Sequence, residues 1–435
     1  MNTDRFKDFD ADVRELVLAF ETGGKGASRF FDADQVEVIA DYYLEVGDVE
    51  GMEAAIRLGE QLYPANTDIR LRRAHLYSIQ GYLPQALRLL KELEQSEPNN
   101  TDVCYSLGTL FSAMGKSRES IAYFLKAATD GYDLGMIYGN IGDEYSKLHN
   151  TAQAVRYYRK AVAHNPEEER SLYRLSSIWD GQGRHTQSEQ FFSHHVEEHP
   201  YSKVGWFCLG DIYLFSLSLY EKAVDAYEYA LAIDKTYYSA YLHLSYAYSQ
   251  LNDLPKAVRA LHDSLDYTDD RPFVLYSIGS VYQEVGNYHT ASIYYHDAIK
   301  EDPSRDIIWC SLGQCSEQLG YLDEAAGYYN RAISLEPEYD GNWLCLADLY
   351  ISRQRFAEAA ALLDSVRAEA SMSFEFDTRL AFCYFMQGRR NRLFTLLREI
   401  APTYGAHILS ILKTFPEMSH DTELVSFITQ LSGQK

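Results

Sequence analysis

The sequence predicts an all-α protein built from stacked helical hairpins. Three observations predict it: a period of 34 residues, two helical hydrophobic patterns in each period, and a small residue at a fixed place within it. The prolines show the period most directly, because pairs of them stand 34 residues apart: Pro64 and Pro98, Pro166 and Pro200, and Pro303 and Pro337. One extra residue within 214–220 shifts the frame for the rest of the chain. Such periodicity indicates a repeat architecture in which each repeat is one supersecondary motif.

Each repeat is expected to hold two amphipathic helices. Apolar residues recur at the fourth, seventh, eighth and eleventh positions, and again at the twentieth, twenty-fourth and twenty-seventh. Spacings of three and four residues place these side chains on one face of a helix, whereas a strand would need alternation. Between the two helices stands a residue suited to the left-handed conformation at a helix C-terminus. These residues are Gly47, Gly81, Gly115, Gly183, Asn252, Gly286, Gly320 and Gly388.

The eighth position of the repeat is small, which allows two helices to cross closely. Its residues are Ala40, Ala74, Gly108, Gly142, Ser176, Gly210, Ser245, Gly279, Gly313, Ala347 and Ala381. The eleventh position is aromatic in all of these repeats except the one with Ser316. Bulky rings beside small residues are therefore expected to interlock in the core.

The best-formed repeat carries a recognisable motif, which consists of Trp206, Leu209, Gly210 and Tyr213, then Ala223, Tyr227 and Ala230. It resembles the signature of the tetratricopeptide repeat family, W-x2-L-G-x2-Y followed by A-x3-F-x2-A. The resemblance implies a right-handed α-α superhelical solenoid of helix-turn-helix repeats. The frame divides residues 33–405 into eleven repeats: 33–66, 67–100, 101–134, 135–168, 169–202, 203–237, 238–271, 272–305, 306–339, 340–373 and 374–405.

The two ends of the chain are expected to close the stack, because a terminal repeat needs a partner with a water-tolerant outer face. Residues 1–32 are predicted to form a helix over Asp10–Glu21 and a flexible joint at Gly23–Ser28. Residues 406–435 are predicted to form capping helices, as part of a degenerate pair over Tyr404–Lys413 and Asp421–Leu431 that is split near Pro416.

The charge of the chain disfavours nucleic acid as a partner. The 435 residues carry a formal charge of −23, whereas a protein that binds phosphates needs a basic face. The one basic cluster, Arg389, Arg390 and Arg392, lies at a predicted turn, where solvated arginines are ordinary. No apolar run reaches the ~18 residues of a membrane span, and the first residues lack the pattern of a secretory signal. We therefore expect a cytoplasmic protein with no membrane or nucleic-acid partner, and the sequence leaves its oligomeric state open.

No catalytic, cofactor or metal site is expected. The segment His195–His199 fits the H-x-x-E-H pattern of zinc proteases. The repeat frame, however, places His195 at a packing position and His199 in the turn before Pro200, so both ligands are not expected on one helix face. The segment Gly23–Ser28 lacks the first glycine and the preceding strand of a phosphate-binding loop. The six cysteines lie in predicted first helices without a C-x2-C pair, and we interpret them as buried thiols.

The family resemblance also implies a concave groove. In that geometry the second, fifth, ninth, twelfth and thirteenth positions of each repeat point into the groove, with the sixth close by. Asn140, Arg170 and Arg174 occupy such positions. They resemble part of the carboxylate clamp with which co-chaperone members of the family hold a peptide C-terminus, since a guanidinium group can bind a carboxylate through two hydrogen bonds.

Two observations leave undecided whether these residues act as a carboxylate clamp. The preceding repeat has Tyr105 and Thr109 where the clamp of the family carries a lysine and an asparagine. The arginines can instead be solvated side chains that pair with groove acids such as Asp143 and Asp180.

Further candidate peptide-binding residues follow along the groove: Phe207, Asp211, Phe215, Tyr246 and Tyr276. Aromatic anchors beside polar groups suit the binding of an extended or helical peptide segment. The alternative is that these rings pack between adjacent first helices.

The sequence therefore predicts a non-enzymatic scaffold that binds a protein or peptide segment in the concave groove. A competing prediction is a targeting or regulatory subunit whose catalytic part lies on another chain. A free-standing hydrolase would depend on the segment His195–His199 alone, and stoichiometric zinc in the purified protein would favour it.

Overall fold

The protein is all-α, as predicted. The computed structural model describes residues 11–23, 31–129, 133–367 and 373–432, and this part of the chain contains helices and no strand. The predicted joint after Gly23 lies outside the described residues. The chain divides into two compact units, an N-terminal unit (Met1–Ile233) and a C-terminal unit (Asp234–Lys435).

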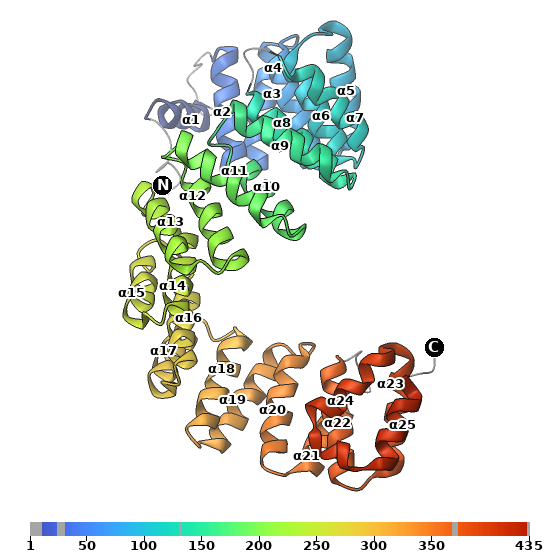
Figure 1. Cartoon of the computed structure of the whole chain (residues 1–435). Helices are drawn as coiled ribbons and strands as arrows, with labels where there is room; N and C mark the ends of the chain where they lie inside the picture. Colours follow the sequence, from blue (N-terminus) through green and yellow to red (C-terminus); the bar gives the residue numbers. More distant parts are fainter. Residues whose placement is uncertain (1–10, 24–30, 130–132, 368–372, 433–435) are drawn as a thin grey trace. The chain divides into compact units, whose positions relative to one another are not determined.

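In the N-terminal unit, α1 (Ala11–Gly23) precedes a series of helical hairpins that follow one another in chain order (Figure 1). The hairpins pair α2 (Ala33–Glu45) with α3 (Val49–Leu62), α4 (Thr67–Ile79) with α5 (Leu83–Ser96), α6 (Thr101–Ala113) with α7 (Ser117–Ala127), α8 (Leu134–Lys147) with α9 (Thr151–His164), α10 (Glu169–Gly181) with α11 (His185–Glu198), and α12 (Lys203–Asp211) with α13 (Tyr220–Ile233). Each second helix also packs against the first helix of the next hairpin, as α3 does against α4.

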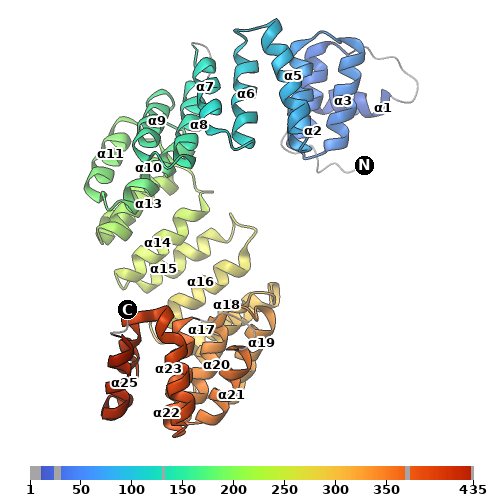
Figure 2. The same cartoon turned by 90° about the vertical axis from the view of Figure 1, so that its right-hand side faces the viewer.

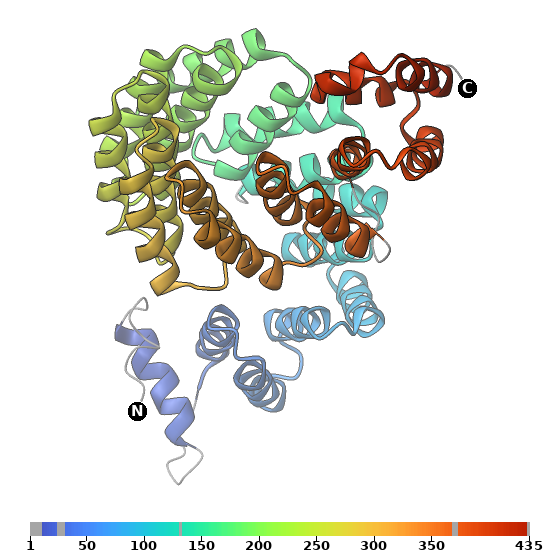
Figure 3. The ribbon, with the colours of Figure 1, turned by 90° about the horizontal axis from the view of Figure 1, so that it is seen from below.

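The C-terminal unit continues the pattern (Figures 2 and 3). Its hairpins pair α14 (Tyr238–Gln250) with α15 (Leu254–Ser264), α16 (Arg271–Glu284) with α17 (Tyr288–Glu301), α18 (Asp306–Gln318) with α19 (Leu322–Leu335), α20 (Asp340–Ser352) with α21 (Phe356–Arg367), and α22 (Phe374–Met386) with α23 (Arg390–Tyr404). First helices of successive hairpins also touch, as α18 touches α20. The first helices therefore lie next to one another, and the second helices pack on their other side.

The turns within the hairpins have the backbone conformation that the sequence predicts. All seven predicted glycines and Asn252 have positive φ, from 59° at Asn252 to 85° at Gly320. The residue after each of them closes the turn: the Asp48 N–H donates to the Tyr43 carbonyl over 2.8 Å, as in a Schellman motif.

Three turns adopt the same conformation without glycine or asparagine. His149, Ser218 and Gln354 have φ values of 55°, 54° and 57°. A β-carbon is strained in this region of backbone space, so these turns are maintained by the packing of the helices on either side. Their residue types gave no local signal for the conformation.

The glycines at the eighth position lie against an aromatic ring, but the ring comes from a different place than the sequence suggested. The expected partner was the aromatic residue at the eleventh position. The structure instead places the ring of the twenty-fourth position, on the second helix of the same hairpin, over the glycine. A β-carbon on Gly142 would lie 2.5 Å from Cε1 of Tyr158, and one on Gly210 would lie 2.6 Å from Cε1 of Tyr227. The missing side chain therefore sets the distance between the two helices of one hairpin.

The extra residue within 214–220 takes the form of a π-helix. α12 continues as η2 (Ile212–Ser216), in which the Leu217 N–H donates to the Ile212 carbonyl over 3.0 Å. The turn then closes with a bond from the Leu219 N–H to the Tyr213 carbonyl, which spans one residue more than the bond from Asp48 to Tyr43. An insertion into a helix is commonly accommodated in this way. The rest of the hairpin keeps its packing.

The repeated prolines take part in a link between successive hairpins. The indole N–H of Trp206 donates to the carbonyl of Pro200 over 2.9 Å, and Trp309 bonds Pro303 over the same distance. Each proline ends one hairpin and each tryptophan lies in the first helix of the next, so the bond fixes where the next helix starts.

The two ends of the chain are only partly as predicted. α1 packs Val17 into the core of the first hairpin, in agreement with the predicted helix over Asp10–Glu21. At the other end, where a degenerate helix pair split near Pro416 is predicted, the first helix of the pair is irregular and the second is α25. Gly405 has φ 52° and ends α23, and the chain continues as η3 (Gly405–Ser410), α24 (Ile411–Thr414) and η4 (Pro416–His420) before α25 (Thr422–Ser432). α25 packs against η3 and η4.

Candidate peptide-binding groove

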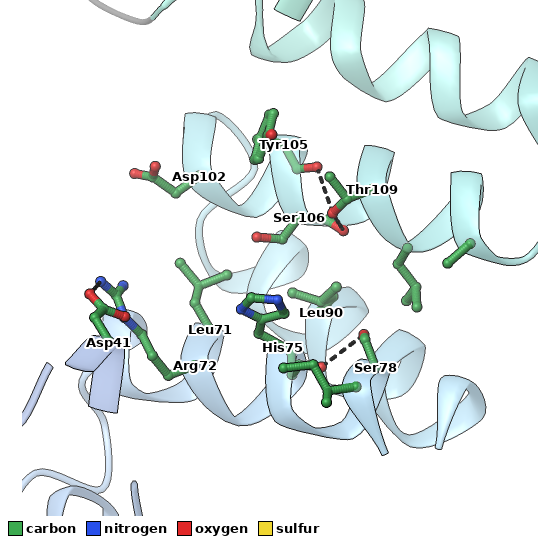
Figure 4. Close-up of a pocket in the computed structure, with 14 residues that line it drawn as sticks. Asp41, Leu71, Arg72, His75, Ser78, Leu90, Asp102, Tyr105, Ser106 and Thr109 are labelled. Carbon is green, nitrogen blue, oxygen red and sulfur yellow. Dashed lines mark hydrogen bonds and ion pairs between the residues drawn. The ribbon is translucent and has the colours of Figure 1, made fainter. Parts of the chain in front are cut away.

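A pocket of about 600 Å³ lies between the first helices α4 and α6, and we call it the α4–α6 pocket (Figure 4). Its apolar lining consists of Leu71, Ala74, Ile79, Leu90, Leu110 and Ala113. Its polar lining consists of Asp41, Arg72, His75, Ser78, Asp102, Tyr105, Ser106 and Thr109. A concave pocket that combines apolar surface with polar groups is a common form of binding site.

The sequence of α4 explains why these side chains share one face. Leu71, His75, Ser78 and Ile79 are the fifth, ninth, twelfth and thirteenth residues of their repeat, and spacings of four, three and one bring them to one side of the helix. In Figure 4, Leu71, His75 and Ser78 lie opposite the residues of α6. The lining thus follows the positions that the family resemblance assigns to the groove.

Two charged groups at this pocket, Arg72 and Asp41, are paired with each other. Arg72 donates two hydrogen bonds to Asp41, over 2.8 Å from Nη2 and 3.2 Å from Nε, and its Nη2 also lies 3.6 Å from Glu37. Burial lowers the pKa of His75, although the carboxylate of Asp41 acts in the opposite direction. His75 is therefore neutral at pH 7, and its ring can both donate and accept a hydrogen bond.

A second pocket, of about 540 Å³, lies along α8, and we call it the α8 pocket. It brings together three of the residues predicted from the sequence, Asn140, Arg170 and Arg174. Tyr105 and Thr109 of α6 line both this pocket and the α4–α6 pocket, so the two are neighbouring parts of one groove.

Asp143 is the residue that organises the two arginines. Its carboxylate lies 3.2 Å from Nη1 of Arg170 and 3.5 Å from Nε of Arg174. The buried hydroxyl of Tyr158 donates to the same carboxylate over 2.7 Å. Pairing with Asp143 is thus one of the two interpretations that the sequence left open. Both guanidinium groups remain partly exposed, and an Arg has five N–H donors, so donors remain for a ligand.

The other expected acid, Asp180, has different partners. It accepts a hydrogen bond from the Ser216 hydroxyl over 2.9 Å and lies 3.5 Å from Nδ1 of His185. Asn140 also has a protein partner, because its side-chain amide donates to the hydroxyl of Tyr105 over 3.3 Å. This bond connects α8 to α6 at the point where the two pockets meet.

A buried carboxylate forms the floor of the α8 pocket. Glu144 is almost fully buried and pairs with Nζ of Lys147 over 2.6 Å, while the Ser112 hydroxyl donates to it. Burial alone would raise the pKa of Glu144, but the hydrogen bonds from Lys147, Ser112 and Ser117 outweigh it and lower the pKa. Glu144 is therefore ionised at neutral pH, which keeps Lys147 at the pocket.

The predicted aromatic residues of the N-terminal unit lie in two different environments. Phe207 is only 5% exposed, and its ring packs 6.1 Å from Tyr173 and 5.7 Å from Tyr227. Phe215, in η2, is 56% exposed. Asp211 accepts a hydrogen bond from the Tyr227 hydroxyl over 2.7 Å. Phe207 thus follows the packing alternative, whereas Phe215 presents its ring on the surface.

The predicted residues of the C-terminal unit also differ. Tyr246 of α14 is exposed. Tyr276 of α16 is partly buried, its ring lies 5.6 Å from that of Tyr295, and burial raises its pKa. A smaller pocket of about 320 Å³ in this unit is lined by Ser280, Gln283, Glu284, Tyr288, Gln314 and Gln318. The Gln283 amide donates to Gln314 over 2.9 Å.

Three family models, each described as tetratricopeptide repeat, match the chain. One matches residues 101–129, another matches 140–203 and 276–342, and a third matches 318–378. The chain is a tetratricopeptide repeat protein. The family resemblance found in the sequence is thereby confirmed.

Two curated proteins are similar to this tetratricopeptide repeat protein. Anaphase-promoting complex subunit 3 of Schizosaccharomyces pombe is 22% identical over 244 residues, which are 56% of this chain and 36% of that protein. TPR repeat-containing protein YpiA of Bacillus subtilis is 19% identical over 352 residues, which cover 64% of this chain and 81% of YpiA. The chain therefore spans about a third of the length of the fission-yeast subunit.

Two solved structures match the chain with low overall similarity. The crystal structure of MamA matches with a TM-score of 0.32 and 21% identity, over 47% of this chain and 93% of MamA. The crystal structure of the APC/C hetero-tetramer Cut9–Hcn1 matches with a TM-score of 0.38 and 12% identity, over 95% of this chain and 91% of that chain.

The α4–α6 pocket was missed in the choice of site residues from the sequence, although the signal for it was present. Leu71, His75, Ser78 and Ile79 stand at the groove positions of their repeat, but the search favoured aromatic and charged side chains. No single residue of this pocket has an unusual sequence context. What marks it is that two successive first helices, α4 and α6, both contribute residues at groove positions to its lining.

The zinc-protease pattern does not assemble a metal site in this tetratricopeptide repeat protein. His195 is buried in α11, and its Nε2 lies 3.1 Å from Oγ of Ser202, the residue that caps α12. His199 follows the end of that helix. Within the described part of the chain, no group of three or more His, Cys, Asp or Glu side chains is arranged to hold a metal ion.

The basic cluster is involved in ion pairs. Arg390 pairs with Asp421 and Glu423, and Nη1 of Arg392 lies 3.3 Å from Asp364. Among the helices that the structure describes, none has the length and apolar character needed to cross a membrane.

Proposed function

We propose that this protein is a non-enzymatic interaction scaffold that binds a protein or peptide segment along the inner face of its first helices. The observation that supports it most is the continuity of the α4–α6 pocket and the α8 pocket through Tyr105 and Thr109. Together they offer an apolar pocket at one end and two arginines at the other. A groove of this kind suits a segment with an apolar side chain and a nearby carboxylate.

The charge of the groove supports a preference of this kind. The chain as a whole is strongly acidic, with a formal charge of −23, but Arg170, Arg174 and Lys147 gather at the α8 pocket. Two acids, Asp143 and Glu144, lie beneath them and are hydrogen-bonded to protein groups. An incoming carboxylate therefore meets guanidinium donors first, in a partly enclosed site where such hydrogen bonds are stronger than in water.

A second candidate function is a subunit of a larger assembly whose catalytic part lies on another chain. The specific observation in its favour is the similarity to a protein named as a subunit of the anaphase-promoting complex. In that case the groove would dock a segment of another subunit, and the chain would act as a targeting or regulatory arm. The protein would be expected to co-purify in a fixed ratio with that subunit.

A pair of matched substitutions tests whether the α4–α6 pocket binds the partner. Ile79 lines this pocket and is 44% exposed, whereas Leu125 of the second helix α7 is 46% exposed and does not line it. Partners purified with the wild-type protein should be lost with Ile79→Asp and retained with Leu125→Asp. Equal loss with both variants, or with neither, would contradict binding at this pocket.

A synthetic peptide copied from the captured partner then tests the arginines. The peptide is made with a free C-terminal carboxylate and as the amide, and its binding is measured by fluorescence anisotropy. We expect the double substitution Arg170→Gln and Arg174→Gln to lower the affinity for the free-acid peptide by about tenfold and to leave the affinity for the amide unchanged. The control is the same charge change on second helices, Arg118→Gln with Arg156→Gln. If the binding of both peptides were weakened equally, the proposed recognition of the carboxylate would be contradicted, whereas binding in the groove would not.

A further inference from the structure

Two cysteines of adjacent repeats lie in contact in the C-terminal unit. Cys310 of α18 and Cys345 of α20 are free thiols whose Sγ atoms are 3.0 Å apart. The S–S bond of a disulfide is ~2.05 Å long, so a movement of about 1 Å would join them. The interpretation of all six cysteines as buried thiols is therefore wrong for this pair. Cys310 and Cys345 are only partly buried, whereas the other four are buried.

The surroundings of the pair favour reaction at Cys345. The two Sγ atoms share a hydrogen bond in which either sulfur can be the donor. This hydrogen bond lowers the pKa of Cys345, and the amide of Gln314, which lies 4.0 Å from Cys345 and 3.9 Å from Cys310, adds to the effect. Burial and the carboxylates of Asp348 and Glu317 act in the opposite direction. The pKa of Cys310 is raised, first by its hydrogen bond to Cys345 and then by burial. The pair thus has one thiol that ionises first and a second thiol beside it that remains protonated.

The remaining cysteines lack this arrangement. Burial raises the pKa of Cys315 to about 11 and that of Cys383 to about 12, and it also raises the pKa of Cys104 and Cys208. A thiol reacts with oxidants as the thiolate, and access of the oxidant is needed as well. Both requirements single out Cys345, with Cys310 as the thiol that would resolve its oxidised form.

We propose that Cys310 and Cys345 form an oxidation site that takes hydrogen peroxide and closes to a disulfide between α18 and α20. In the first step the Cys345 thiolate attacks the O–O bond of the peroxide, which yields Cys345 sulfenic acid and, after protonation of the leaving oxygen, water. The thiol of Cys310 then attacks the sulfenic sulfur, the S–S bond forms, and the hydroxyl leaves as a second water. The two thiols lose two electrons and two protons, and the peroxide is reduced to two water molecules.

The position of the pair gives the disulfide a structural consequence. Cys310 and Cys345 stand at the fifth and sixth positions of successive repeats, which are positions on or beside the groove face. α18 and α20 are first helices in direct contact, each packed on its own second helix. A covalent bond between them fixes the spacing of two successive repeats. Oxidation therefore converts a junction held by packing into one held by a bond.

The test uses the full-length reduced protein and hydrogen peroxide as the probe. After treatment, the count of free thiols in denaturant should fall from six to four and return to six with dithiothreitol. Trypsin leaves Cys310 in the peptide 306–331 and Cys345 in the peptide 332–353, and mass spectrometry should find these two peptides linked. Because Cys315 shares the first peptide, the same link should persist in Cys315→Ser and disappear in Cys310→Ser.

A thermal measurement gives a second readout on folded protein. Peroxide should raise the melting temperature of the wild type and of Cys383→Ser, and dithiothreitol should reverse the rise, whereas Cys345→Ser should show no rise. Should Cys345→Ser fail to fold, the peptide map of the wild type decides by itself. The proposal is overturned if peroxide gives sulfinic acid on Cys345 without a link, if the link joins other cysteines, or if all six thiols react at equal rates.

Discussion

Gly313 of α18 and Tyr329 of α19 are complementary across their hairpin, because the Tyr329 ring occupies the space that a β-carbon on Gly313 would need. The same ring is held at its far end, where its hydroxyl donates to Glu317 of α18 over 3.1 Å. The ring is almost fully buried. It therefore cannot yield to a larger residue at position 313 without losing both its packing and its hydrogen bond.

Replacing Gly313 by alanine should destabilise the protein by about 1–3 kcal/mol through overpacking. The measurement is the midpoint of urea unfolding, with the slope of the transition as a check that the unfolded state is unchanged. Gly327 of α19 provides the control, since a β-carbon there meets no atom within 4 Å. Gly327→Ala should be stabilising by about 0.5–1 kcal/mol, because glycine weakens a helix interior. The same sign for both changes would contradict the packing argument.

Replacing His149 by glycine should stabilise the protein by about 1 kcal/mol. His149 is exposed and has φ 55°, and an L-residue in this conformation is strained by roughly 1–2 kcal/mol, part of which the greater freedom of unfolded glycine offsets. Thermal unfolding would show the effect as a higher melting temperature. The reverse change, Gly115→Ala at φ 70°, should lower it. No change at either turn would mean that these backbone angles differ in solution.

The stability of the N-terminal unit should depend on pH through His195. Burial is the main cause that lowers the pKa of this buried imidazole to about 4 from an ordinary value near 6.5. The unfolded state therefore binds a proton that the folded state does not. The contribution of His195 to the free energy of unfolding is fully present above pH 6.5 and decreases as the pH falls. It is lost by about pH 4, and the total loss is about 3 kcal/mol. The free energy of unfolding, measured at several pH values, should fall across this window.

His195→Gln separates this effect from the titration of carboxylates. Glutamine can still reach Ser202 with a polar group but cannot titrate. The fall in stability between pH 6.5 and pH 4 should be smaller in the variant by about the amount given above. Parallel curves for the two proteins would show that His195 is protonated in the folded state or exposed to water.

Replacing Asp143 by asparagine tests the competition between this carboxylate and a ligand for Arg170 and Arg174, on the assumption that the proposed groove binds a carboxylate. Asparagine keeps an acceptor for the Tyr158 hydroxyl but removes the charge that pairs with the arginines. The affinity for the free-acid peptide should rise by roughly fivefold, since an exposed ion pair contributes at most about 1 kcal/mol. A weaker affinity would show instead that Asp143 holds the arginines in position.

Most of the architecture could be inferred from the sequence alone, because every repeat shows the same local sequence signals. The period, the two helical patterns and the residues for left-handed turns are local properties, and each recurs often enough to outweigh a poor match in any one repeat. Even the extra residue within 214–220 is visible in the sequence. The groove positions of the repeat also contain Leu71 and Ile79, so these pocket residues are predictable from their place in the repeat.

The tertiary structure decided which side chains meet, because that depends on how the helices of one hairpin and of successive hairpins pack together. The ring over Gly313 comes from the second helix, the extra residue becomes a π-helix, and Arg170 and Arg174 share Asp143. Cys310 and Cys345 are 35 positions apart in the chain and 3.0 Å apart in space. Sequence periodicity assigns each residue to a face of its helix, whereas the small offsets between successive hairpins determine its contacts.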